Sequence, residues 1–151
     1  MSPATKRAAA QRANTRDLSL ADYQLLAEFR HTLAHFLAFS AGAAQQAGLA
    51  PRQHQALLAI KGAPGGKPMT VGDLAARLVI RHHSAVELVD RMTLAGYLLR
   101  HTDAQDRRRA ILRLTAAGER VLADLSAVHR AELRRIAPLL GTLISQLGAP
   151  S

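Results

Sequence analysis

Residues 74–115 read LAARLVIRHHSAVELVDRMTLAGYLLRHTDAQDRRRAILRLT, and this stretch decides the fold. Periodicity predicts one helix ending near residue 78 and a second over 82–94, followed by strand-like apolar segments at 97–102 and 110–115. The turn between the strands, 103–109, carries two aspartates and three consecutive arginines. A helix, a turn, a second helix and a basic hairpin in this order are typical of proteins that read duplex DNA.

Local signals set the expected element boundaries on either side. Ser19 and Asp22 have the spacing of a capping box, which predicts a helix from there to about Gln46. A second helix is expected from Pro51 to Gly62, and Thr70-Val-Gly-Asp73 repeats the capping pattern for a helix over 71–78. Lys67-Pro68-Met69 suits a short edge strand. After residue 115 we expect a long helix up to Pro138 and then a separate apolar segment, 139–147.

Charge is concentrated where the hairpin lies. The chain has 151 residues, 48% hydrophobic, with 20 Lys and Arg against 11 Asp and Glu, a net charge of +9. Between Arg77 and Arg113 there are eight arginines and four acids, so this stretch alone carries +4. The excess favours a polyanionic partner, although a basic solvated surface is the alternative. The chain has no cysteine, which is compatible with a reducing cytoplasm, and no apolar run approaches the length of a membrane span.

The second helix of the pair is the predicted recognition helix. Its apolar residues Ala85, Leu88, Val89 and Met92 form one stripe for the core, so the opposite face is left for DNA. The candidate contacts are Arg81, His82, His83, Ser84, Glu87 and Arg91. Arg81 could read guanine or clamp a phosphate, and Arg91 is expected on a phosphate. Glu87 could accept from a cytosine amino group or pair with Arg91.

The hairpin turn supplies the second set of candidate contacts. Arg107, Arg108 and Arg109 suit the negative potential of a narrow minor groove. Asp106 is expected to orient Arg108 through a charge-assisted bond rather than to contact DNA. A solvated hairpin without a partner is the alternative.

These residues together resemble the MarR family of winged helix-turn-helix regulators. The resemblance rests on Leu-Ala-Ala-Arg-Leu at 74–78, Leu-Val-Asp-Arg-Met at 88–92 followed by Gly96, Asp106-Arg-Arg108, and Leu114-Thr-x-x-Gly118. It implies a mainly α fold with a small antiparallel β-wing and N- and C-terminal dimerisation helices. It also implies a homodimer on a palindromic operator, usually as a repressor, released in many members by a small aromatic anion bound between the dimer and DNA-binding parts. Arg108 matches the wing arginine that enters the minor groove.

Two positions depart from the family pattern. Glu87 stands where many members have a basic residue, and Gln105 stands where many have arginine. With Arg81-His82-His83 in place of a Ser/Thr-rich first turn, these departures suggest an operator preference of its own.

The expected organisation is a single structural domain in four parts. They are a basic disordered tail (1–17), an N-terminal dimerisation helix (18–48), the winged helix-turn-helix region (51–115) and C-terminal dimerisation helices (116–151). The apolar residues Leu133, Ile136, Leu139, Leu140, Leu143, Ile144 and Leu147 are more than a short terminal element should expose, which supports dimerisation.

Two further sites are weighed on the first helix. Tyr23, Arg30, His31 and His35 mix aromatic and basic groups that could bind an aromatic anion, although aromatic residues at this spacing also suit a core or dimer interface. His31 and His35 have the spacing of a metal-binding pair, but no cysteine or nearby carboxylate completes a zinc site. No cofactor is expected.

The sequence therefore predicts a sequence-specific DNA-binding regulator without enzymatic activity. The principal alternative is a nonspecific architectural DNA-binding protein. A small enzyme finds no support, because no nucleophile, base and acid set, phosphate loop or metal-ligand set is present. A winged-helix protein-interaction module is kept open by Glu87 and Asp90 on the outer face.

Overall fold

The computed structural model describes residues 18–148, so the tail predicted at 1–17 lies outside the described residues. The elements follow in the order α2 (Leu20–Gln46), α3 (Pro51–Lys61), η1 (Pro64–Gly66), β1 (Met69–Thr70), α4 (Val71–Leu78), α5 (His82–Leu94), β2 (Leu98–Thr102), β3 (Ala110–Leu114) and α6 (Ala116–Leu147). A single domain was expected, but the chain forms two compact units. Of the described residues, 18–37 and 132–148 belong to one, and 38–131 to the other.

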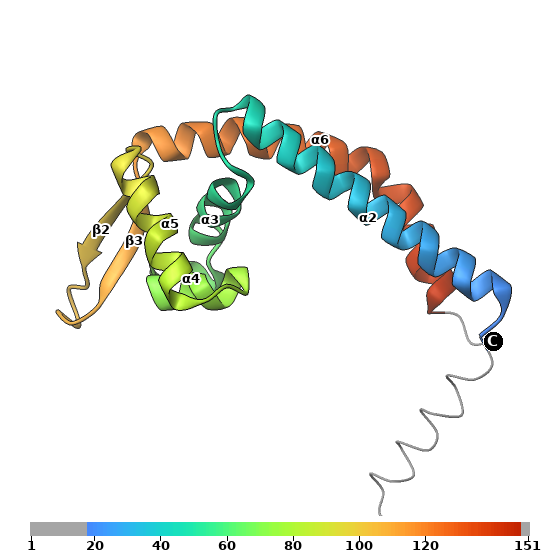
Figure 1. Cartoon of the computed structure of the whole chain (residues 1–151), viewed down its shortest axis with the longest axis horizontal. Coiled ribbons are helices and arrows are strands. Elements are labelled where there is room, and N and C mark those ends of the chain that lie inside the picture. Colours follow the sequence, from blue (N-terminus) through green and yellow to red (C-terminus); the bar gives the residue numbers. More distant parts are fainter. Residues whose placement is uncertain (1–17, 149–151) are drawn as a thin grey trace, which may run out of the picture. The chain divides into compact units, whose positions relative to one another are not determined.

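The unit of residues 38–131 is a winged helix-turn-helix with its own hydrophobic core. Helices α3, α4 and α5 lie together, and the β2–β3 hairpin extends beside α5 (Figure 1). The sheet is antiparallel in the order β1-β3-β2, with Met69 opposite Leu112 and Leu98 opposite Leu114. Side chains from these helices and strands fill the core, and its largest fully buried members are Leu49, Leu57, Leu74, Val89, Met92 and Leu98.

The capping signals act as predicted at two helix starts. The Asp73 carboxylate accepts hydrogen bonds from the Thr70 amide and hydroxyl, both at 2.8 Å, and the Asp73 amide donates back to the Thr70 hydroxyl at 3.2 Å. Ser19 and Asp22 make the same set of bonds at the start of α2. These bonds satisfy amides that would otherwise lack partners, so the helix starts are confirmed.

The turn between α4 and α5 contains a strained residue. Val79 has φ 53° and ψ 49°, the left-handed conformation that usually requires glycine. In this conformation the Ile80 amide reaches the Ala75 carbonyl at 3.0 Å and the Val79 amide reaches Ala76 at 3.3 Å. The left-handed conformation of Val79 lets the chain reverse direction within a few residues. Val79 is 89% exposed.

The hairpin is joined to α6 by a compact set of backbone contacts. The Thr115 hydroxyl donates to the Gly96 carbonyl at 2.6 Å and accepts from the Gly118 amide at 3.0 Å. The Thr115 amide donates to the Tyr97 carbonyl at 3.0 Å. A Cβ on Gly118 would overlap that same carbonyl oxygen, so the Thr-x-x-Gly motif has a steric reason. The joint fixes the base of the wing to the start of α6.

The other unit contains the first part of α2 and the last part of α6. The expected break at Pro138 is wrong, because α6 continues through it to Leu147 as one helix. An interior proline removes one helical hydrogen bond and costs about 3 kcal/mol. Burial of Ile136 and Leu143 on either side offsets that cost. The region after residue 115 is therefore one helix rather than several.

Candidate nucleic-acid interface

Helix α5 presents the predicted face to the outside of the 38–131 unit. Ala85, Leu88, Val89 and Met92 are buried as the periodicity requires, and the stripe is confirmed. His82, His83, Glu87 and Arg91 are exposed, while Ser84 is half-buried. Arg81 is the N-cap residue with extended backbone, and its side chain makes no capping bond. The candidate contacts therefore lie on or at the start of one helix that the core holds in place.

The ion pairs around α5 differ from the pair considered in the sequence. Among the described residues, Glu87 and Arg91 form no ion pair with each other or with another residue. Asp90 instead pairs with Arg100 of β2, with 2.7 Å between the carboxylate and guanidinium. This pair connects the recognition helix to the wing. Because Glu87 and Arg91 form no such pair among the described residues, their side chains are available to a partner.

The wing turn is organised by its two aspartates. The Asp106 carboxylate accepts the Arg108 amide at 3.0 Å, and the Asp103 carboxylate accepts the Gln105 amide at 2.9 Å. We expected Asp106 to accept a charge-assisted bond from the Arg108 guanidinium, but it accepts one from the Arg108 backbone amide instead. Such a bond is typical of aspartate in turns. Asp106 shapes the loop, and the exposed side chains of Arg107 and Arg108 have no partner among the described residues.

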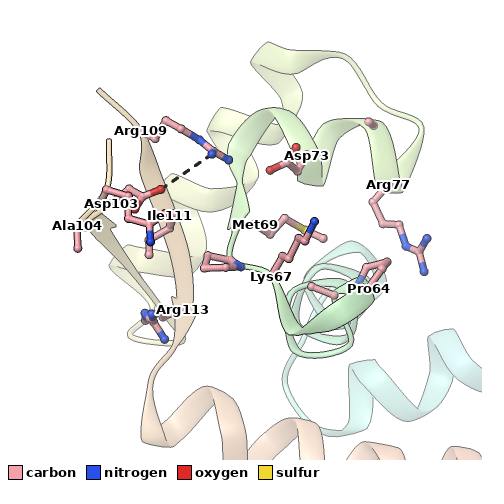
Figure 2. A pocket seen from close by; sticks show the side chains of 14 residues that line it. Pro64, Lys67, Met69, Asp73, Arg77, Asp103, Ala104, Arg109, Ile111 and Arg113 are labelled. Carbon is pink, nitrogen blue, oxygen red and sulfur yellow. Dashed lines mark hydrogen bonds and ion pairs between the residues drawn. The ribbon is translucent and has the colours of Figure 1, made fainter. Parts of the chain in front are cut away.

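Arg109 is placed differently from its two neighbours. Its guanidinium lies 4.0 Å from the Asp103 carboxylate, and its backbone closes the turn by accepting the Asp103 amide at 2.8 Å. The Arg109 side chain lines a cavity of about 950 Å³ between the wing, α4 and the segment before β1. Figure 2 shows its position in this lining. Of the three wing arginines grouped in the sequence, Arg109 alone lines this cavity.

The residues weighed for an effector site lie elsewhere. Tyr23, Arg30, His31 and His35 are all exposed on α2, in the unit of residues 18–37 and 132–148. The His31 and His35 rings lie 4.3 Å apart, edge to face. None of the four lines the cavity beside the wing. Within residues 18–148, no group of three or more histidine, aspartate or glutamate residues could hold a metal ion.

A pair of histidines, one buried and one half-buried, escaped the sequence analysis. His54 of α3 is only 4% exposed, and its ring lies 4.5 Å from that of His129 in α6. Burial lowers the pKa of His54, and the nearby His129 lowers it further. The Nδ1 of His129 lies 2.6 Å from the Leu125 carbonyl and Nε2 lies 2.7 Å from the Ser40 hydroxyl. The available signal was the i, i+3 spacing of His54 and the core residue Leu57.

Comparisons with known proteins agree with this geometry. The sequence model of the MarR family matches residues 47–109. The HTH-type transcriptional regulator YcgE of Bacillus subtilis (strain 168) is 33% identical over 97 residues, which are 64% of this chain and 61% of YcgE. The match thus spans less than two thirds of that relative. Over residues 47–109 the chain therefore resembles the MarR family.

Several solved structures share the fold of this chain. A MarR family protein from Bacillus stearothermophilus superposes with a TM-score of 0.67 at 22% identity, covering 76% of this chain and 77% of that one. AbsC, a MarR family transcriptional regulator from Streptomyces coelicolor, gives 0.65 at 21% identity, covering 89% and 86%. The Staphylococcus aureus MepR–DNA complex gives 0.58 at 23% identity, covering 78% and 82%. Within residues 18–148, no helix is long and apolar enough to cross a membrane.

Proposed function

We propose that this protein is a member of the MarR family and a sequence-specific DNA-binding transcription regulator that acts as a repressor. The observation that carries the proposal is the exposed outer face of α5. On this face Glu87 and Arg91 have no ion-pair partner among the described residues, and the opposite face is a fully buried apolar stripe. A helix anchored in this way can enter the major groove, where glutamate and arginine distinguish base edges. The structural relative MepR is known in complex with DNA, which supports the same partner class.

In this proposal the two arginine sites have different tasks. Arg91 and the first turn of α5, Arg81 to Ser84, contact the major groove, where Glu87 contributes to base choice. Arg107 and Arg108 are exposed at the wing tip and have no side-chain partner within residues 18–148, so they suit the adjacent minor groove. Arg109 supports the wing from its pair with Asp103.

We further propose that the protein works as a homodimer on a palindromic operator. In the unit of residues 18–37 and 132–148, one copy exposes large apolar side chains that water would not favour. They are Leu20, Leu26, Leu33 and Leu37 of α2 and Leu133, Leu139, Ile144 and Leu147 of α6. A twofold dimer would match a palindrome whose half-sites lie about 34–36 Å apart. The variant Ile144→Lys should sediment as a monomer and bind operator weakly, whereas a dimeric variant would contradict this arrangement.

The experiment that tests the function compares its own upstream intergenic DNA with scrambled duplex across a salt series. A regulator should bind its operator about 10³–10⁷ times more tightly than random duplex. Arg108→Gln should weaken binding to both duplexes and reduce the salt slope by about 1, because one cation that enters the negative potential of the minor groove is lost. Glu87→Gln should change sequence preference instead. Arg120→Gln, an exposed arginine of α6, is the matched control.

Equal affinity for both duplexes would favour a nonspecific architectural protein, and no binding to either would favour a protein-interaction module. A cytoplasmic location and release by a small ligand stay predictions. No enzymatic step is proposed.

A further inference from the structure

An apolar side chain, that of Val86, interrupts the polar outer face of α5. Val86 lies three residues after His83 and four before Asp90, so these side chains are neighbours along one side of the helix. His83 and Asp90 are exposed, and Val86 is half-buried. The face that we assign to DNA therefore contains a hydrocarbon group between polar ones.

The packing of the 38–131 unit does not account for this valine. Among the described residues, neither the hydrophobic core nor the half-buried apolar side chains packed against it include Val86. Leu78 and Ile80, which are also half-buried and precede α5, do pack against that core. Valine is also less favourable in a helix than alanine, because its branched Cβ restricts the side chain. Neither core packing nor helix propensity explains a valine at this position.

The side of α5 that carries Val86 is turned toward the wing. Asp90, one helical turn farther along this side, pairs with Arg100 of β2 at 2.7 Å. The β2–β3 hairpin extends beside α5 (Figure 1). With α5 in the major groove and the wing tip in the adjacent minor groove, Val86 faces the base edges on the wing side of the helix.

The chemistry of valine restricts what it can recognise there. The side chain has no hydrogen-bond donor or acceptor, so it cannot pair with the nitrogen and oxygen groups of the base edges. Thymine differs from the other bases because it presents a C5-methyl group in the major groove. Valine in a helix also holds largely one rotamer, so its two methyl groups are positioned before DNA arrives and little entropy is lost on contact.

We propose that Val86 is a specificity-determining residue that packs against the C5-methyl group of a thymine in the operator. The assignment rests on the function proposed above and adds a base preference to it. His83 and Glu87 meet the hydrogen-bonding groups of neighbouring bases, and Val86 selects an A·T pair beside them. Loss of this methyl contact weakens binding roughly fourfold, which corresponds to one buried methylene group.

The test removes the methyl group from the DNA and its contact from the protein. In the operator footprinted within the upstream intergenic DNA, each thymine is replaced in turn by deoxyuridine, which lacks the methyl group and keeps the base pairing. We expect one thymine of a half-site whose replacement weakens wild-type binding roughly fourfold. In Val86→Ala, which has already lost the contact, the same replacement should have no further effect. Val128→Ala, at a 46% exposed position of α6, is the matched control and should respond as the wild type does.

Urea unfolding of Val86→Ala separates a contact to DNA from a structural role. Because Val86 is not part of the core, the urea midpoint should stay close to that of the wild type. A large loss of stability would show that Val86 supports α5 and would overturn the assignment. So would a wild type that no thymine replacement affects, or an equal effect of the replacement in Val86→Ala.

Failure of the assignment can be told apart from failure of the proposed function. Specific binding to the operator, without a thymine whose effect depends on Val86, would overturn the assignment alone. Equal wild-type affinity for operator and scrambled duplex would refute the proposed function, and the assignment with it.

Discussion

Replacing Gly118 with alanine tests the joint between the wing and α6. The added Cβ would overlap the Tyr97 carbonyl oxygen and lie 3.3 Å from the carbonyl carbon. This neighbour is backbone and cannot rotate away, so either the wing or α6 must shift. Overpacking of this kind costs about 1–3 kcal/mol. The shift would also strain the Thr115 bonds to Tyr97 and Gly96, worth about 1 kcal/mol each.

The expected loss for Gly118→Ala is therefore about 2–4 kcal/mol, after the small gain that alanine normally brings to a helix. This loss is a large part of the free energy of unfolding of a typical domain, which is roughly 5–15 kcal/mol. Urea unfolding followed by circular dichroism, at one protein concentration, gives the difference directly. Gly42→Ala is the matched control, because a Cβ there meets nothing within 4 Å in α2. It should raise stability by about 0.5–1 kcal/mol. Equal stability of the two variants would refute the steric account.

Three further outcomes are expected. Because burial holds the pKa of His54 below its ordinary value of 6.5, the unfolded chain takes up the proton first as pH falls. The free energy of unfolding should be highest above about pH 6.5 and should fall below that pH by at most about 1.4 kcal/mol per pH unit. His54→Gln should flatten the plot of urea midpoint against pH, whereas His35→Gln, at an exposed position, should not. Val79→Gly should raise the free energy of unfolding by roughly 0.5–1 kcal/mol, because relief of the left-handed strain exceeds the cost of the greater entropy that glycine gives the unfolded chain. If Val79→Ala gave the same gain, strain would not be the cause. Asp90→Asn should cost less than about 1 kcal/mol in urea, because the ion pair with Arg100 is 55% and 38% exposed, and a larger loss would show that the pair braces the wing.

Signals that act within a few residues were enough to predict most element boundaries. The Thr70–Asp73 capping box places the start of α4, and the stripe from Ala85 to Met92 orients α5. Both depend on bonds or spacings of at most one or two helical turns, which the sequence displays directly. The wrong prediction of a helix end at Pro138 also came from relying on a local signal. The local preference of proline is to end a helix, whereas the burial of Ile136 and Leu143 that outweighs it depends on tertiary packing.

The site was predictable in its residue types but not in its pairings. The exposed face of α5 follows from periodicity, and the sequence leaves open whether Glu87 pairs with Arg91. Only the fold shows that these two residues form no ion pair in the part of the chain that the structure describes. Asp90 finds Arg100 instead, ten residues away and on a different element. The pairing of His54 with His129 spans α3 and α6, and no spacing within one helix could have predicted it.

The three wing arginines show how a run of like charges separates into different tasks. In the sequence, Arg107, Arg108 and Arg109 are equivalent members of one basic turn. The turn geometry set by Asp103 and Asp106 leaves the first two side chains without a partner among residues 18–148, whereas the third lies against Asp103 at the cavity. A cation that is already paired gains less from a phosphate than a free one, because the existing pair must first be broken. The strength of the wing's hold on DNA should therefore depend on Arg107 and Arg108.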